Sequence, residues 1–220
     1  MNMVARSDFV VHIQGLCIDP PNFCMIMELK KGGDLYKLLH SGKTIEWPLR
    51  MTYAQQITKG LNFIHQYMLH RDLKSLNVLL NEDQTVASVS DFGLAEPKTE
   101  SMGASLAVET LNHYGTPYWM APESLAVLAE YSVHSDVYGL GMIFYEWALQ
   151  KVPFQGVPVP VAIQAIQKGD CPDIDSHPIP PGFAKLIKLC WDQTPKNRPE
   201  TKQLIVDLEQ CIKDVSKPKV

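Results

Sequence analysis

The chain has 220 residues, of which 45% are hydrophobic, and this length suits one domain with a sizeable core. Its formal net charge is −4 and no run of like charges occurs, so we expect neither nucleic-acid nor membrane-surface binding. The longest apolar run, 137–149, contains Glu146 and is too short to span a bilayer. No secretory signal follows Met1, and we expect a cytoplasmic protein.

The cysteine pattern gives no sign of a metal site or a disulfide framework. The number of cysteines is odd, and no Cys-x-x-Cys pair occurs. We therefore expect reduced thiols rather than zinc ligands or disulfides. The five residues are Cys17, Cys24, Cys171, Cys190 and Cys211.

A β-hairpin is predicted near the start of the chain. Residues 9–18 and 23–29 are rich in β-branched and apolar residues, which favours two strands. Asp-Pro-Pro-Asn at 19–22 predicts a turn between them, because proline fixes φ and asparagine tolerates turn geometry.

Helix signals follow the hairpin. Gly32 and Gly33 break the second strand, and Asp34 can cap a short helix that runs through Leu39. Residues 49–66 carry apolar side chains at spacings of three and four, which predicts an amphipathic helix.

The remainder of the chain predicts two short strands and then mostly helices. We predict strands over 78–80 and 86–90, and a mobile loop without periodicity over 96–114. The run 137–149 predicts a helix buried on all sides. Further helices are expected over 161–168, ended by Gly169, and over 183–191 and 200–215, with proline-rich connections at 153–160 and 171–181.

The segment 70–77, His-Arg-Asp-Leu-Lys-Ser-Leu-Asn, places an acid, a cation and an amide in one loop. Phosphoryl transfer needs mainly positioning and charge neutralisation. Asp72 can orient an attacking hydroxyl and take up its proton, and Lys74 can stabilise charge on the transferring phosphate. Asn77 and Asp91 offer the oxygen ligands that Mg²⁺ takes.

Each of these residues also has a plainer interpretation. Alone, Asp72 would cap a turn, Lys74 would be a solvated surface lysine, and Asn77 would be a turn residue before a strand. Asp-Phe-Gly at 91–93 is a weak motif by itself. Their order along the chain favours a phosphotransfer site, because it is the order in which a protein kinase presents these groups. For His70 we prefer a structural role.

At these residues the chain resembles the eukaryotic protein kinases. The segment 70–77, Asp-Phe-Gly-Leu-Ala at 91–95 and Gly-Thr-Pro-Tyr-Trp-Met-Ala-Pro-Glu at 115–123 are most similar to the tyrosine-kinase-like serine/threonine group, which includes the mixed-lineage and receptor-interacting kinases. Cys-Trp-Asp at 190–192, Pro195 and Asn-Arg-Pro at 197–199 match the late part of that pattern. The resemblance covers residues 9–212 and implies an α+β protein-kinase fold.

The resemblance implies ATP and Mg²⁺ as cofactors. Asp72 would be the catalytic aspartate, Lys74 would contact the γ-phosphate, and Asn77 and Asp91 would hold Mg²⁺. The nucleotide would be bound by the gatekeeper Met27, by a hinge of Glu28, Leu29 and Lys30 whose backbone meets adenine, by Asp34 at the ribose, and by Leu79 beneath the adenine ring.

Other residues take structural roles in this resemblance. His70 and Phe92 would join the internal apolar spine, and Asp136 would anchor the catalytic loop. Glu123 and Arg198 would form a buried ion pair. Losing one partner of such a pair costs roughly 3–5 kcal/mol, which indicates a structural rather than a catalytic role.

Residues 91–123 would form the activation segment. Its candidate phosphosites are Thr99, Ser101, Ser105, Thr110 and Tyr114. A phosphate there is expected to pair with Arg71 and order the segment. Thr116 together with Lys74 favours serine and threonine over tyrosine as acceptors.

The resemblance divides the chain into an N-lobe remnant of two strands (1–27), a hinge (28–33), a mostly α-helical C-lobe (34–214) and a tail (215–220). Residues 1–27 include no glycine-rich loop and no lysine. In kinases a strand lysine must pair with a helix glutamate for activity. We therefore expect the 220 residues alone to bind nucleotide weakly and to have little activity, as an internal piece of a longer protein or as a truncated isoform.

Two other functions stay open. The chain could be a non-catalytic module that binds proteins or acts as a decoy, although Asp72, Lys74, Asn77 and Asp91 together argue against a pure scaffold. A small-molecule phosphotransferase is disfavoured by the peptide-binding motifs at 115–123. The expected partners are a protein substrate with a serine or threonine acceptor, an upstream kinase and a second copy of the chain.

Overall fold

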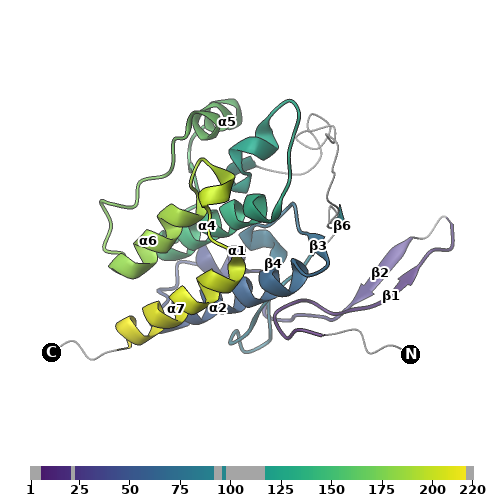
Figure 1. The fold of residues 1–220 in the computed structure, drawn as a ribbon. Coiled ribbons are helices and arrows are strands. Elements are labelled where there is room, and N and C mark those ends of the chain that lie inside the picture. Colours follow the sequence, from purple (N-terminus) through teal and green to yellow (C-terminus); the bar gives the residue numbers. More distant parts are fainter. Residues whose placement is uncertain (1–5, 21–22, 92–95, 98–116, 217–220) are drawn as a thin grey trace.

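The computed structural model describes residues 6–20, 23–91, 96–97 and 117–216, which form a helical body and three two-stranded antiparallel sheets (Figure 1). The α+β class predicted from the sequence is confirmed. The elements in chain order, with η for 3₁₀ turns, are β1 (Ile13–Cys17), β2 (Cys24–Met27), α1 (Leu35–Leu39), α2 (Trp47–Ile64), β3 (Met68–Leu69), η1 (Ser75–Asn77), β4 (Val78–Leu80), β5 (Ala87–Val89), β6 (Glu96–Pro97), η2 (Pro117–Trp119), η3 (Pro122–Leu125), α4 (Val133–Leu149), α5 (Val159–Lys168), α6 (Pro181–Cys190), η4 (Pro195–Asn197) and α7 (Thr201–Val215).

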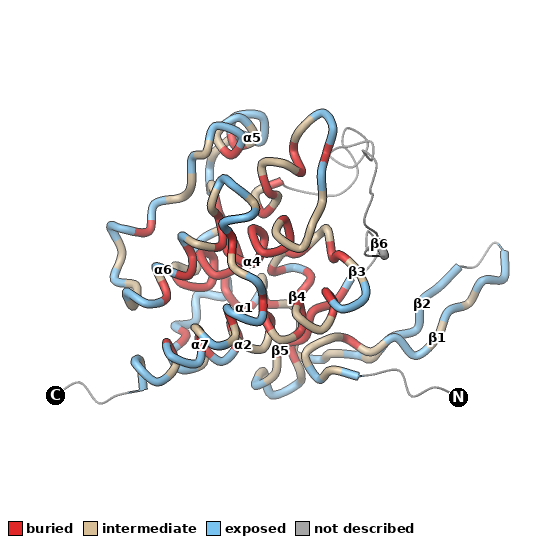
Figure 2. Tube along the Cα trace, in the orientation of Figure 1, coloured by how far each residue is buried: buried red, intermediate tan, exposed pale blue. Residues whose placement is uncertain are grey.

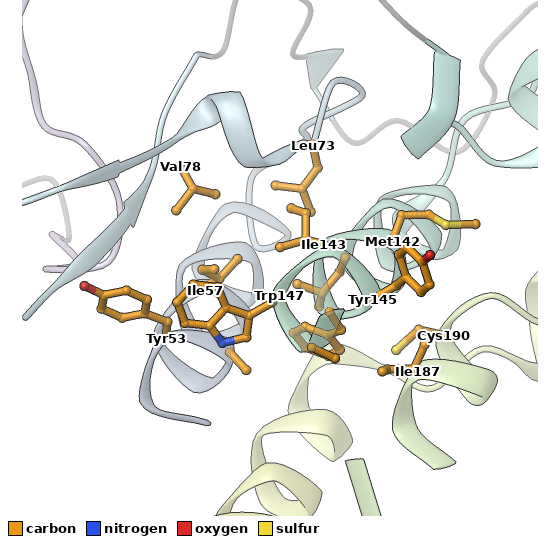
Figure 3. Close-up of a cluster of buried hydrophobic side chains, with 14 of the residues drawn as sticks. Tyr53, Ile57, Leu73, Val78, Met142, Ile143, Tyr145, Trp147, Ile187 and Cys190 are labelled. Atoms are coloured by element: carbon orange, nitrogen blue, oxygen red, sulfur yellow. The ribbon is translucent and has the colours of Figure 1, made fainter. Parts of the chain in front are cut away.

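Helix α4 forms the centre of the body, and every residue from 135 to 148 is buried. The helix begins four residues before the predicted run because Ser132 and Ser135 form a capping box, in which each side chain accepts from the other's backbone amide. Its apolar side chains pack on α2 on one side and α6 on the other. Figure 3 shows Trp147 beside Tyr53 and Ile57 of α2, with the rings of Trp147 and Tyr53 5.1 Å apart.

Helix α2 is shifted by two residues from the predicted range of 49–66. Pro48 lies in the first turn of α2. Its missing N–H costs no hydrogen bond there, because the N–H groups of a first turn have no partner within the helix. The buried Arg50 donates from Nε to the carbonyl of Ile45 at 2.6 Å and from Nη1 to that of Trp147 at 3.1 Å. Nη1 also donates to the carbonyl of Ala148, so the arginine satisfies two carbonyls near the C-terminus of α4. Helix α7 also packs along α2.

The hairpin of β1 and β2 projects from the body and is exposed along both strands (Figures 1 and 2). Both strands are shorter than predicted. The first part of the predicted strand 9–18 belongs to the body instead: Val11 N donates to the carbonyl of Val89 at 2.8 Å, and Val89 N donates to that of Phe9 at 2.8 Å. Only glycine fits at position 60 of α2, because a Cβ there would collide with the Phe9 carbonyl.

The later elements follow the predicted pattern with small shifts of their ends. Gly169 adopts a φ of 96° and ends α5, as expected of a glycine beyond a helix C-terminus. The predicted loop 96–114 is wrong at its start, since Glu96 and Pro97 pair with β3; residues 98–114 lie outside the described part. Within the described ranges, no helix is long and apolar enough to cross a bilayer.

Candidate active site

A buried carboxylate of α4 anchors the loop 70–77, which connects β3 and β4. Asp136 accepts the backbone amides of His70 at 2.9 Å and Arg71 at 2.8 Å, and it also accepts from Nε2 of His65 at 2.9 Å. Burial raises the pKa of Asp136, but the hydrogen bonds and charge of His65 outweigh this and the net pKa is lowered. An ionised carboxylate therefore fixes the start of the loop.

The backbone of this loop is strained at the point of attachment. Arg71 has a φ of 68°, in the left-handed region that non-glycine residues rarely adopt. Asp91 has a φ of 63°. Such conformations cost about 1–3 kcal/mol each and cluster at functional sites. Two strained residues at the two loops that carry the predicted site favour a functional interpretation of both.

The three predicted catalytic side chains lie together. Lys74 Nζ contacts both oxygens of Asp72, at 2.9 and 2.7 Å, and Asn77 Nδ2 donates to Asp72 Oδ2 at 2.9 Å and to its carbonyl at 2.7 Å. The loop therefore presents an oriented carboxylate with a cation beside it. A carboxylate held in this way can act as a base for a hydroxyl proton that comes within hydrogen-bond reach.

His70 links the catalytic loop to the strand that leads to Asp91. The ring is fully buried, its Nδ1 accepts from Asp72 N at 3.3 Å, and its Nε2 lies 3.0 Å from the carbonyl of Ser90. This pair of contacts requires a neutral ring with the proton on Nε2. Such a ring cannot accept a substrate proton at either nitrogen without losing a bond, so a structural role for His70 stays the prediction.

Asn77 and Asp91 are brought together by Ser90. The Ser90 amide and hydroxyl both donate to the carbonyl of Asn77, at 2.8 and 3.1 Å, so the residue before Asp91 is fixed against the end of η1. Among the described residues no cluster of three metal-ligating side chains occurs. Two oxygen ligands fit Mg²⁺, which commonly binds through one or two protein ligands, waters and substrate phosphates.

The segment after β2 meets β4 at a junction that includes Asp34 and Leu79, two of the predicted nucleotide-binding residues. Gly32 N donates to the carbonyl of Leu80 at 3.0 Å, and Leu80 N donates to that of Gly33 at 2.8 Å. A Cβ at Gly32 would collide with the Asn81 carbonyl, so only glycine allows this approach. Asp34 caps α1 through Lys37 N at 2.8 Å, as predicted, and bridges Leu79 through the backbone.

The hinge expected at 28–30 follows β2 directly. Glu28 N donates to the carbonyl of His12 at 2.9 Å, and its carboxylate pairs with Lys30 at 2.8 Å. Met27 and Leu29 are exposed, with 41% and 79% of their surfaces accessible. Met27 and Leu29 thus face solvent at the base of the hairpin, whereas Asp34 and Leu79 lie beside each other at the junction with β4.

One further buried carboxylate joins three segments around the site. It was not among the site residues predicted from the sequence. Glu146 of α4 is fully buried; its Oε1 lies 2.9 Å from His40 Nε2 and accepts from Ser75 Oγ at 2.9 Å, and its Oε2 accepts from Trp119 Nε1 at 3.1 Å. Burial raises its pKa against the opposing effect of these hydrogen bonds. The only sequence signal was a lone acid in an apolar helix, which must be paired when buried.

Glu123 and Arg198 meet as expected from the resemblance. Arg198 Nη1 and Nη2 contact the two carboxylate oxygens at 2.6 and 2.9 Å, and the arginine side chain is fully buried. Arg71, the expected phosphate receptor, stacks on the ring of Tyr131 at 4.3 Å. The remaining predicted residues lie outside the described part: Phe92, Thr99, Ser101, Ser105, Thr110, Tyr114 and Thr116.

A mixed α and β body that presents an aspartate, a lysine and an asparagine from one loop, with a second aspartate close by, has the arrangement expected of the protein-kinase class. The chain belongs to the protein tyrosine and serine/threonine kinase family, whose pattern it matches over residues 1–208.

Curated relatives carry the same assignment in their names. The chain is 33% identical to the serine/threonine-protein kinase STY46 of Arabidopsis thaliana over 213 residues, covering 96% of this chain and 36% of the relative. It is 33% identical to mitogen-activated protein kinase kinase kinase 10 of Mus musculus over 215 residues, covering 91% and 22%. It is 34% identical to the serine/threonine/tyrosine-protein kinase HT1 of Arabidopsis thaliana over 214 residues, covering 93% and 52%. The chain thus spans from about a fifth to about a half of these relatives.

Proposed function

We propose that the protein transfers the γ-phosphate of ATP to serine or threonine hydroxyls of protein substrates. The observation that carries this proposal is the Asp72 carboxylate, which Lys74 and Asn77 hold in a loop that Asp136 anchors. Phosphoryl transfer asks the protein for positioning and charge stabilisation rather than covalent chemistry. This site offers both within one short loop.

In the proposed reaction, Asp72 orients the substrate hydroxyl and accepts its proton. Lys74, which contacts both oxygens of Asp72, also reaches the transferring phosphate and stabilises its charge. Asn77 and Asp91 hold Mg²⁺, which neutralises charge on the phosphates of ATP. His70 and Asp136 act through the loop that they position rather than on the substrate.

The nucleotide site of this proposal lies along the junction of β2 and β4. The backbone of Glu28 to Lys30 meets adenine, Met27 is the gatekeeper, Asp34 reaches the ribose, and Leu79 lies beneath the ring. The division into residues 1–27, 28–33, 34–214 and 215–220 belongs to the proposal, as do a cytoplasmic location and an upstream kinase or a second copy as partner. The activation segment 91–123 is regulated by phosphate that pairs with Arg71.

The test is a phosphotransferase assay on the full-length protein, with mass spectrometry of the phosphorylated residue. Asp72→Asn should reduce kcat by at least about 10²-fold, in the range of a lost proton acceptor. The matched control is Asp175→Asn, which changes an exposed carboxylate that pairs with Lys188 and should leave kcat unchanged. Equal activity of the Asp72→Asn variant and the parent would refute the proposal.

The 220 residues alone should be poor catalysts, because no lysine in residues 1–27 can form the Lys–Glu pair that kinases require. The measurement compares this polypeptide with the protein purified from its native source, whose intact mass is determined in the same experiment. A rapid Asp72-dependent rate from the 220 residues would contradict this part of the proposal.

The exposed apolar hairpin favours one alternative, a module that binds proteins without catalysis. Its exposed apolar side chains are Ile13, Leu16, Ile18, Phe23, Met25, Ile26, Met27 and Leu29. Apolar surface of this kind marks an interaction site. If Asp72→Asn leaves the cellular effect of the protein unchanged, this alternative is favoured over catalysis.

A further inference from the structure

Two of the five cysteines are brought face to face by the hairpin. Cys17 is the last residue of β1 and Cys24 is the first residue of β2, and they are direct partners in the antiparallel register. This proximity was not predicted, because six residues separate the two cysteines and no Cys-x-x-Cys spacing occurs. The pairing of the strands, rather than the spacing, makes them neighbours.

The geometry of antiparallel strands suits a bond between these two residues. Directly opposed residues have Cα atoms about 4.5 or 5.5 Å apart, depending on the type of pair, and their side chains lie on the same face. Disulfides span Cα separations of about 4.4–6.8 Å. The Cα separation of either type of pair therefore falls within the range that a disulfide needs.

We infer that Cys17 and Cys24 form a reversible intramolecular disulfide when the protein meets a peroxide. One thiol loses its proton, and the thiolate attacks a peroxide oxygen; the O–O bond breaks to give a sulfenic acid and hydroxide, which takes up that proton and becomes water. The second thiol attacks the sulfenyl sulfur, the S–S bond forms, and the S–O bond breaks with loss of a second water. Two thiols and one hydrogen peroxide thus give one disulfide and two water molecules.

Access favours this pair over the other cysteines. Cys24 is exposed and Cys17 is half-buried, whereas Cys190 and Cys211 are buried. Burial raises the pKa of Cys171 to about 11 and also raises the pKa values of Cys190 and Cys211, which disfavours their thiolates. Because the thiolate is the reactive form, peroxide should act first on the hairpin.

The disulfide would act on the segment that leads into the hinge. It would fix the register in which Leu16 opposes Met25, and β2 ends at Met27, one residue before Glu28. An exposed two-stranded hairpin is marginally stable by itself, so a covalent link between its strands would stabilise it. The inference itself concerns the two thiols and does not depend on phosphotransfer.

The experiment treats the protein with hydrogen peroxide, unfolds it, alkylates the free thiols and measures the mass of the chain. The number of alkylated thiols should fall by two per chain. Trypsin releases residues 7–30 as one peptide that contains both cysteines, and cleavage before Asp19 divides it between them. The two fragments should stay joined after oxidation and separate on reduction.

The controls are Cys17→Ser and Cys24→Ser, each of which should abolish the joined fragments, and Cys171→Ser, which should leave them unchanged. The oxidised protein should run as a monomer on a non-reducing gel. Sulfinic acids on the two cysteines without a link, a link to Cys171, or a link between two molecules would each overturn the inference.

Discussion

The guanidinium of Arg198 binds both carboxylate oxygens of Glu123, which lies 75 residues earlier in the chain. The same arginine also donates from Nη1 to the carbonyl of His134 at 2.9 Å and from Nε to that of Asp192 at 2.8 Å. One buried cation thus joins η3, the start of α4 and the turn before α7. The pair fixes the end of the segment that the kinase resemblance identifies as the activation segment.

Removing either partner should destabilise the fold. Arg198→Ala leaves the Glu123 carboxylate without its cation, and breaking such a buried pair costs about 3–5 kcal/mol of unfolding free energy. The control is Lys188→Ala, which breaks the exposed pair with Asp175 and should change stability by less than about 1 kcal/mol. Urea unfolding measures both, and equal effects of the two substitutions would contradict a structural role for Arg198.

Asp136→Asn should release the start of the catalytic loop. An amide has one acceptor oxygen, so it cannot accept from His65, His70 and Arg71 in the way that the carboxylate does. We expect kcat of the full-length protein to fall about tenfold or more while the KM for ATP changes little, since the nucleotide junction is untouched. A change confined to KM would show that the anchor serves nucleotide binding instead.

The same residue predicts an acid-sensitive contribution to stability. The folded-state pKa of Asp136 is lowered, so its carboxylate contributes stability above the unfolded pKa of about 3.9, and this contribution is lost as pH falls through the folded pKa. The folded-state pKa of Glu146 is raised, so its effect on the pH dependence of stability has the opposite sign. The difference in unfolding free energy between the parent and Asp136→Asn should therefore shrink below about pH 4. Urea unfolding across this range checks it, and a difference that grows in acid would be inconsistent.

Gly32→Ala should displace the junction between the hinge and β4. Its Cβ would collide with the backbone carbonyl of Asn81, which cannot swing aside as a side chain could. We expect weaker nucleotide binding by the full-length protein and a loss of stability of about 1–3 kcal/mol, typical of overpacking. Gly15→Ala is the matched control, because open space surrounds that glycine on the hairpin. Isothermal titration calorimetry should show a lower affinity for ATP in Gly32→Ala than in Gly15→Ala. An unaltered affinity in Gly32→Ala would contradict the proposed hinge.

Several features were predictable from the sequence because they depend on local chemistry. Asp34 caps α1 through an amide three residues away, and Gly169 ends α5 with a positive φ. The apolar residues of α2 repeat with the period of a helix, and those of α4 cover all sides of the helix. In each case the interacting groups are a few residues apart, so the residue types alone determine the conformation.

Other features depend on contacts between distant segments. Residues 9–18 were predicted as one strand, yet residues 9–11 pair with β5 and residues 13–17 with β2, since the choice of partner is made by packing on α2. Glu146 finds partners 106, 71 and 27 residues away in His40, Ser75 and Trp119. The sequence by itself determined the chemical groups of the site and the helices that carry them. Only the tertiary structure decided which buried charges and which thiols meet, because burial forces polar groups to find partners wherever the folded chain brings them.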